Sequence, residues 1–263
     1  MQALLPLVFV SLLVLSTPLH AADENTPTFM TTRGKLLASE DFSKPLAPLT
    51  GNPDNFASGY SGWRYNLAPR AGAWTLIDGA FHGATNAEAH HPAAVTYGLD
   101  YRNAIIECEM RMDEVPLGGT MGNYMQIRTT GLKGYVCSIG IESSGFRIQK
   151  DDITGGGKHT QQDKNDDGPD VRVPLGSFKT PVKFGEWQKI VFEIFGEEMT
   201  ATMNGHSLTG THPLIASDKH SIMFDFGAAG SVRNFKVWEA LPNPDWPKSK
   251  AAIQEAMKAL PLR

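Results

Sequence analysis

One pattern dominates this chain. From Lys35 to Glu239, short runs of alternating apolar and polar residues are divided by Gly, Asn, Asp and Pro. Side chains alternate across a strand, so this period is typical of half-buried antiparallel strands, and no helical period interrupts it. We predict strands at residues 35–42, 74–77, 80–83, 93–97, 103–112, 124–129, 135–141, 146–150, 188–195, 198–203, 220–226 and 232–238. So many short strands must curl into two packed sheets or a barrel, and we expect an all-β fold.

The beginning of the chain predicts export. Residues 4–15 are almost unbroken apolar sequence, and Ala21 and Ala22 follow as small residues where a signal peptidase would cut. We therefore predict a signal peptide over residues 1–21 and a periplasmic or extracellular protein. A membrane anchor is the alternative, but the apolar run is shorter than the roughly 20 residues that a bilayer requires.

The remaining chain predicts one domain. Residues 22–34 form an N-terminal linker, and residues 35–240 form a single β-sandwich domain. A Pro-rich segment from Leu241 to Pro247 ends the sheet pattern, and residues 248–260 have the apolar spacing of a short amphipathic helix. We therefore assign residues 241–263 to a Pro-rich segment and a C-terminal helix that packs on the sandwich.

Charge and motifs exclude several classes of protein. The chain has 24 Lys and Arg against 28 Asp and Glu, a net charge of −4 and no dense basic block, so nucleic acid is not an expected partner. A phosphate-binding Gly loop and a Gly-x-Ser-x-Gly elbow are both absent from the sequence, which argues against nucleotide enzymes and serine hydrolases. Cys108 and Cys137 both occupy the apolar phase of a strand, which favours two buried thiols over a disulfide.

The polar phase of the central strands is the main candidate for function. It consists of Glu107, Glu109, Arg111, Tyr124, Gln126, Arg128, Ser138, Glu142, Arg147 and Gln149. If these strands are neighbours, carboxylates, guanidinium groups, an amide and an aromatic ring share one face. Such a face suits sugars, whose hydroxyls take bidentate polar partners and whose C–H faces stack on rings. The alternative is a solvated face with cross-strand ion pairs.

Three further features carry alternatives. Asp163, Asn165 and Asp167 have the spacing of a calcium loop, with Asp170 as a further ligand, but an EF-hand's Glu is replaced by Pro174. A structural calcium site and a solvated loop both remain open, and no other cofactor is expected.

His91 lies in a His pair without metal-ligand spacing, which favours a surface or loop histidine; the alternative is an acid, a base or a sugar hydrogen-bond partner at the rim. Trp63 lies in the Gly-broken aromatic segment from Tyr60 to Tyr65. If exposed, this segment is a stacking platform for sugar, and if buried it plugs the edge of the sandwich.

A set of ordered fragments resembles the 3-keto-disaccharide hydrolase domain family, which is often labelled family 16 glycoside hydrolase. The fragments are Ser61-Gly62-Trp63, Trp74 to Gly79, Gly134-Tyr135, Gly185-Glu186-Trp187, Met203-Asn204-Gly205 and Val232 to Phe235. The resemblance implies a concanavalin A-like fold, a two-sheet antiparallel jelly-roll sandwich whose concave face meets glycans in exported bacterial proteins. It also implies cleavage of oxidised disaccharides.

The candidate catalytic and substrate-binding residues are drawn mainly from the polar phase of the central strands. Glycoside cleavage requires paired carboxylates, for which Glu109 and Glu142 are the candidates. The candidate substrate-binding residues are Tyr124, Gln126, Arg128, Arg147, His91 and Trp63.

The chain also departs from the family pattern. It has Val136, Cys137 and Ser138 where the family has Glu, an apolar residue and Gln, and Arg111 ends the Glu107 and Glu109 strand. These departures favour a non-catalytic lectin-like module as the alternative, with a structural protein of the cell envelope as a third class. The sequence does not indicate the glycan or the oligomeric state.

Overall fold

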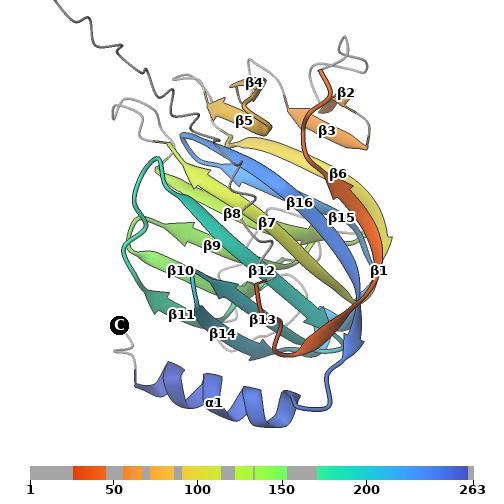
Figure 1. The fold of residues 1–263 in the computed structure, drawn as a ribbon, viewed down its shortest axis with the longest axis vertical. Helices are drawn as coiled ribbons and strands as arrows, with labels where there is room; N and C mark the ends of the chain where they lie inside the picture. Colours follow the sequence, from red (N-terminus) through yellow and green to blue (C-terminus); the bar gives the residue numbers. More distant parts are fainter. Residues whose placement is uncertain are drawn as a thin grey trace, which may run out of the picture.

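The structure is a computed structural model, and it describes residues 26–45, 56–60, 62–66, 72–85, 91–113, 122–132, 134–152 and 171–259. The predicted signal peptide over residues 1–21 and the predicted calcium ligands, Asp163, Asn165, Asp167 and Asp170, lie outside the described residues. The described residues form two antiparallel sheets of eight strands each, packed face to face (Figure 1).

The first sheet, sheet I, contains the long C-terminal strand near its middle. Its strand order is β14 (His206–Thr211), β13 (Glu198–Met203), β12 (Trp187–Phe195), β7 (Ala104–Met112), β16 (Ala229–Pro242), β5 (Ala80–Thr85) and β4 (Gly72–Ile77). The N-terminal strand β1 (Thr31–Glu40) also pairs with β16. Strands from the two ends of the chain therefore lie side by side.

Sheet II packs against the inner face of sheet I. Its order is β11 (Val173–Lys179), β10 (Gly145–Lys150), β9 (Tyr135–Glu142), β8 (Tyr124–Thr130), β15 (Lys219–Phe226), β6 (Ala93–Tyr101), β3 (Trp63–Asn66) and β2 (Phe56–Tyr60). In both sheets a late strand lies between two early ones, which gives the crossed connections of a jelly roll. The predicted two-sheet antiparallel fold is confirmed.

The strand predictions hold for every predicted segment, with shifted ends. Strand β1 begins at Thr31, inside the segment that was predicted to be a linker, because Thr31 and its neighbours pair with the end of β16. Four strands were not predicted: β2, β3, β11 and β14. Asn204 and Gly205 form the turn between β13 and β14 with φ angles of 49° and 83°, which an Asn-Gly pair readily adopts.

The hydrophobic core lies between the sheets, and strand alternation supplies it. Ile106 and Met110 of sheet I face Ile127, Ile139 and Phe224 of sheet II, and all of them have exposed fractions of 0%. Cys108 and Cys137 are free, buried thiols in this core, as expected, and they belong to different sheets.

The C-terminal helix closes one end of the sandwich. Helix α1 (Trp246–Lys258) begins earlier than predicted, because Pro247 fits the first turn of a helix. It lies against β14 and β11, so it spans the edges of both sheets (Figure 1). Met257 accepts a hydrogen bond at its sulfur from the Thr209 amide, over 3.5 Å.

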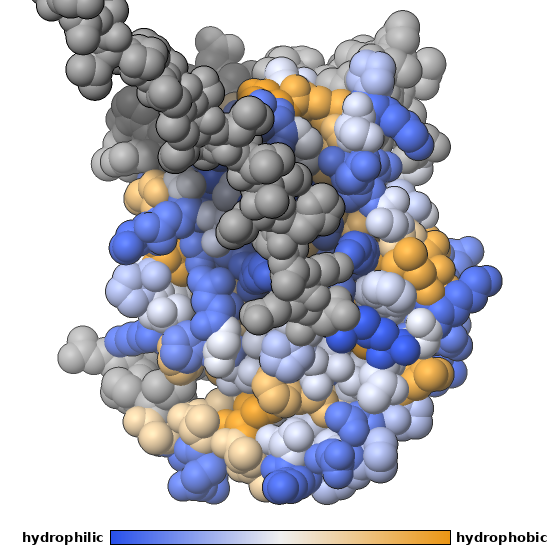
Figure 2. Space-filling model, viewed as in Figure 1, coloured by the Kyte–Doolittle hydropathy of each residue, from blue (hydrophilic) through white to orange (hydrophobic). Residues whose placement is uncertain are grey.

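The surface that the structure describes is mixed in character. The large hydrophobic residues exposed on it are Leu36, Leu37, Ile77, Leu132 and Leu241. On the face seen in Figure 2, hydrophilic and hydrophobic residues are interspersed outside the grey part, without one continuous hydrophobic surface. Among the described helices, none is long and apolar enough to cross a membrane.

Candidate functional site: the polar face of sheet II

The outer face of sheet II carries a cluster of polar side chains, which we call the polar face. On β8, Met125 and Ile127 point into the core, so Tyr124, Gln126 and Arg128 point outward. The strand register then fixes their neighbours. Asp225 lies opposite Gln126 on β15, and Ser138 lies opposite Arg128 on β9.

A buried ion pair lies at the centre of the polar face. Arg128 Nε is 3.0 Å from Asp225 Oδ2, and their side chains are 15% and 2% exposed. This contact has the distance of an ion pair but not the geometry of a hydrogen bond. Both Asp225 oxygens and Arg128 Nε are buried and have no hydrogen-bond partner among the described residues. Burial raises the pKa of Asp225, and the Arg128 guanidinium only partly offsets this effect.

Hydrogen bonds extend from this ion pair across two strands. Arg128 Nη2 donates to Gln126 Oε1 over 2.7 Å, and Gln126 Nε2 donates to Ser138 Oγ over 3.2 Å. Ser138 Oγ donates to Asp151 Oδ2 over 2.9 Å, and Arg172 Nε lies 2.9 Å from the other Asp151 oxygen. These contacts fix the orientation of Arg128, since its neighbours are themselves held in place.

Tyr124 and Tyr135 also lie on the polar face, and Tyr135 packs against the guanidinium of Arg128. The Arg128 Cζ atom lies 4.6 Å from the ring centre of Tyr135, a cation–π distance. Burial, followed by the nearby charge of Asp225, raises the pKa of Tyr124 to about 12 and also raises the pKa of Tyr135. Both phenols are therefore neutral at ordinary pH and can donate a hydrogen bond.

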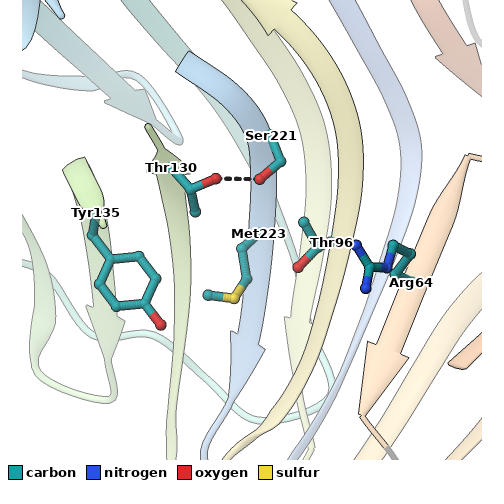
Figure 3. A pocket seen from close by; sticks show the side chains of 6 residues that line it. All are labelled: Arg64, Thr96, Thr130, Tyr135, Ser221 and Met223. Carbon is teal, nitrogen blue, oxygen red and sulfur yellow. Dashed lines mark hydrogen bonds between the residues drawn. The ribbon is translucent and has the colours of Figure 1, made fainter. Parts of the chain in front are cut away.

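An open hollow of about 240 Å³ lies on the polar face, with Tyr135 at one side (Figure 3). Its described lining residues are Arg64, Thr96, Thr130, Tyr135, Ser221 and Met223. A hydrogen bond joins the hydroxyls of Thr130 and Ser221. The hollow is smaller than the roughly 300–1,000 Å³ of pockets that enclose a drug-sized ligand, so it suits part of a larger ligand.

Five predicted site residues lie together on this sheet. Tyr124, Gln126 and Arg128 share β8, and Glu142 pairs with Tyr124 in the strand register. Arg147 forms an ion pair with Glu142, and its guanidinium lies over Gly140. A β-carbon at Gly140 would lie 3.1 Å from Arg147 Cζ, so a larger residue would displace the guanidinium.

The predicted pairing of Glu109 with Glu142 is wrong. Glu109 is on β7, which pairs with β12 and β16 in sheet I, whereas Glu142 is on β9 in sheet II. Both side chains point outward from their own sheets, so the two carboxylates lie on opposite sides of the sandwich. Glu109 instead forms an ion pair with Arg233, whose nitrogen lies 2.6 Å away.

The structure also corrects the prediction that Trp63 binds substrate. Its exposed fraction is 0%, and its ring lies 5.1 Å from that of Phe235 and 6.0 Å from that of Phe224. Strand β3 directs Trp63 into the core and leaves Arg64 on the outside. Of the two alternatives for this aromatic segment, an exposed stacking platform and a buried plug, Trp63 therefore agrees with the second.

The comparisons with known proteins bear on the fold. No family model matches the chain, and no curated protein matches it. A protein of unknown function with a galectin-like fold from Bacillus subtilis is 10% identical, with 81% of this chain and 100% of that chain covered and a TM-score of 0.52. The carbohydrate-binding module CBM66 from Bacillus subtilis is also 10% identical, with coverages of 68% and 96% and a TM-score of 0.50.

These alignments span nearly the whole of both similar structures. The chain has a concanavalin A-like jelly-roll fold. At this level of identity the likeness concerns the fold alone.

The histidines do not form a metal site in the described part of the chain. His91 is exposed just before β6, and its charge is a minor cause that lowers the pKa of Asp225. His82 lies in sheet I, 3.2 Å from Asp113. No group of three metal-ligating side chains occurs within the described ranges, and calcium binding by the loop at residues 163–170 stays a prediction.

Sequence reasoning missed the buried centre of the polar face. Asp225 lies within a predicted strand without a predicted role, and Asp151 has none either. Strand alternation places Tyr135 in phase with the core residue Cys137, but a register shift between β8 and β9 turns Tyr135 outward. A signal was present, because Asp225 interrupts an otherwise apolar strand end between Phe224 and Phe226. A carboxylate between two core-facing rings lies on the outer face, and if it is buried there it requires a cationic or hydrogen-bonding partner.

Proposed function

We propose that this protein binds carbohydrate through the polar face of sheet II. The observation that carries the proposal is the buried Arg128–Asp225 ion pair, whose guanidinium is oriented by a hydrogen bond to Gln126, near an open hollow. A guanidinium that is already oriented donates paired hydrogen bonds to sugar oxygens at little entropic cost. Tyr124 and Tyr135 add hydroxyl donors and ring surface.

The jelly-roll fold supports this proposal, since one similar structure is a carbohydrate-binding module. A glycan array probed with the purified protein tests it. Arg128→Met should weaken binding to the retained glycans by about tenfold or more, because it removes charge-assisted hydrogen bonds.

Sheet I offers a matched control. Arg111 forms an ion pair with Asp113 and lies 4.9 Å from the Trp187 ring centre, much as Arg128 contacts Asp225 and Tyr135. Arg111→Met should therefore leave glycan binding unchanged. A blank array, or equal loss in both variants, would contradict the proposal.

The second candidate is hydrolysis of oxidised disaccharides, the activity of the 3-keto-disaccharide hydrolase family. One observation favours it: burial raises the pKa of Asp225, as a general acid requires. Glu142 and Asp151 are further carboxylates on this side of sheet II, and each already has an arginine partner.

The assay is release of free sugar from 3-keto-disaccharides. Asp225→Asn should abolish release, while Glu109→Gln, the same chemical change on the opposite side of the sandwich, should retain it. Binding of the same disaccharide without release of free sugar would exclude hydrolysis and support only the lectin-like function.

Export is also part of the proposal. The protein should be recovered outside the cytoplasm with a new N-terminus at Ala22. N-terminal sequencing of the fractionated protein tests this, and an intact Met1 would contradict it.

A further inference from the structure

The hollow on the polar face has an unbalanced charge. Three arginines on this side of sheet II have acidic partners: Arg128 with Asp225, Arg147 with Glu142, and Arg172 with Asp151. Arg64 is different, because it is exposed and forms no ion pair with a described residue. No described lining residue of the hollow is acidic, so Arg64 leaves it with a positive charge.

The strand register places Arg64 across the hollow from Arg128. Arg64 on β3 pairs with Thr96 on β6, Thr96 pairs with Met223 on β15, and Met223 pairs with Arg128 on β8. The two arginines are thus three strand spacings apart, about 14 Å between backbones. Figure 3 shows Met223 and Thr96 between Tyr135 at one side and Arg64 at the other.

We propose that this hollow binds an acidic sugar, a uronate unit of a glycan, whose carboxylate pairs with Arg64. The inference rests on the proposed carbohydrate binding and names its ligand class. A planar guanidinium matches a carboxylate with two parallel hydrogen bonds. The hydroxyls of Thr96, Thr130 and Ser221 face the ring hydroxyls of the same unit, and Met223 provides an apolar floor for its C–H groups.

The test compares charged and neutral versions of one ligand. Calorimetry would use oligomers of galacturonate, mannuronate and glucuronate, together with carboxyl-reduced oligomers of the same length and linkage. The natural protein should bind at least one uronate oligomer about tenfold or more tightly than its reduced counterpart. Raising the salt concentration should reduce this preference, because the Arg64 charge is exposed.

Two variants assign the preference to Arg64. Arg64→Gln should lower affinity for the uronate oligomer to that for the reduced oligomer, while affinity for the reduced oligomer stays the same. Lys189→Gln removes one positive charge from an exposed residue of sheet I and should keep the full preference.

The possible failures are distinguishable. Equal binding of acidic and reduced oligomers by the natural protein would overturn this inference and leave the proposed function standing. Retention of the acid preference in Arg64→Gln would also overturn it. Binding of neither kind of oligomer, together with a blank glycan array, would overturn both.

Discussion

Glu193 Oε2 accepts hydrogen bonds from both the main-chain amide and the hydroxyl of Thr31, over 2.7 and 2.8 Å. Its other oxygen accepts the Phe29 amide over 2.9 Å, and Glu193 has an exposed fraction of 0%. The outer side of β12 is therefore covered by the N-terminal segment, which Glu193 attaches to sheet I.

Replacing this carboxylate should loosen the N-terminal segment. In Glu193→Gln, an amide N–H faces amide donors, and we expect a loss of about 1–3 kcal/mol in the free energy of unfolding. Urea denaturation measures it. Glu255→Gln, which alters only an exposed pair with Lys258 on α1, should change stability by less than about 0.5 kcal/mol. Equal effects of the two substitutions would contradict this role.

The raised pKa of Asp225 predicts a pH dependence of stability. Burial raises its pKa in the folded state above the ordinary value of 3.8, so the folded protein holds this proton more tightly than the unfolded chain. The resulting stability is fully present below pH 3.8 and is lost as the pH rises through the raised pKa.

The measurement is the unfolding free energy of the natural protein and of Asp225→Asn from pH 4 to pH 8. The natural protein should lose stability relative to the variant as the pH rises. A relative gain would mean that the attraction of Arg128 outweighs burial and lowers the pKa of Asp225 instead.

Trp63 should support the fold rather than the ligand. Trp63→Ala empties a large volume among Phe81, Phe224 and Phe235, and we expect a loss of about 3–5 kcal/mol in unfolding free energy. Trp63→Phe should lose less and should keep glycan binding at full strength. If Trp63→Phe folds normally but no longer binds glycan, the indole ring of Trp63 contributes to ligand binding and this prediction is wrong.

Gly145 should not tolerate a side chain. Its φ angle is +147°, and a β-carbon there would lie 2.0 Å from the Phe178 carbonyl oxygen. Gly145→Ala should cost at least about 2 kcal/mol, measured by thermal unfolding. Gly98→Ala is the control, since no atom lies within 4 Å of its β-carbon position. Similar melting temperatures for the two variants would exclude close packing at Gly145.

The two thiols should be unreactive in the folded protein. Burial raises the pKa of Cys137 to about 11 and raises that of Cys108 as well, so neither forms a thiolate near neutral pH. A thiol reagent should label neither cysteine in buffer and both in denaturant, as read by mass spectrometry. Rapid labelling in buffer, or a mass that changes with reductant, would contradict this prediction.

The sequence predicted the strands well because alternation is a local property. Each predicted strand is present, and the Asn204-Gly205 turn required only its own two residues. Strand β3 was missed, since Trp63 to Asn66 is short and lies beside glycine and serine. Strand β11 begins with Val173 and Pro174, and a proline there weakens the strand pattern.

The candidate site was only partly predictable, because alternation gives the side of a strand but not its partner. Glu109 and Arg128 have the same phase in two strands that follow each other in the chain. The chain crosses from sheet I to sheet II between these strands, so their outward faces point in opposite directions. The Arg128–Asp225 pair joins residues nearly a hundred positions apart, a separation that no local period encodes.

The central places of β15 and β16 have a consequence for how the protein is made. Strand β15 joins β8 to β6, and β16 joins β7 to β5 and β1. A nascent chain that has not yet reached Lys219 lacks the strand that holds each sheet together, so its earlier strands keep unpaired edges. Neither sheet can be completed before residues 219–242 are available, so long-range pairing is the last step in its assembly.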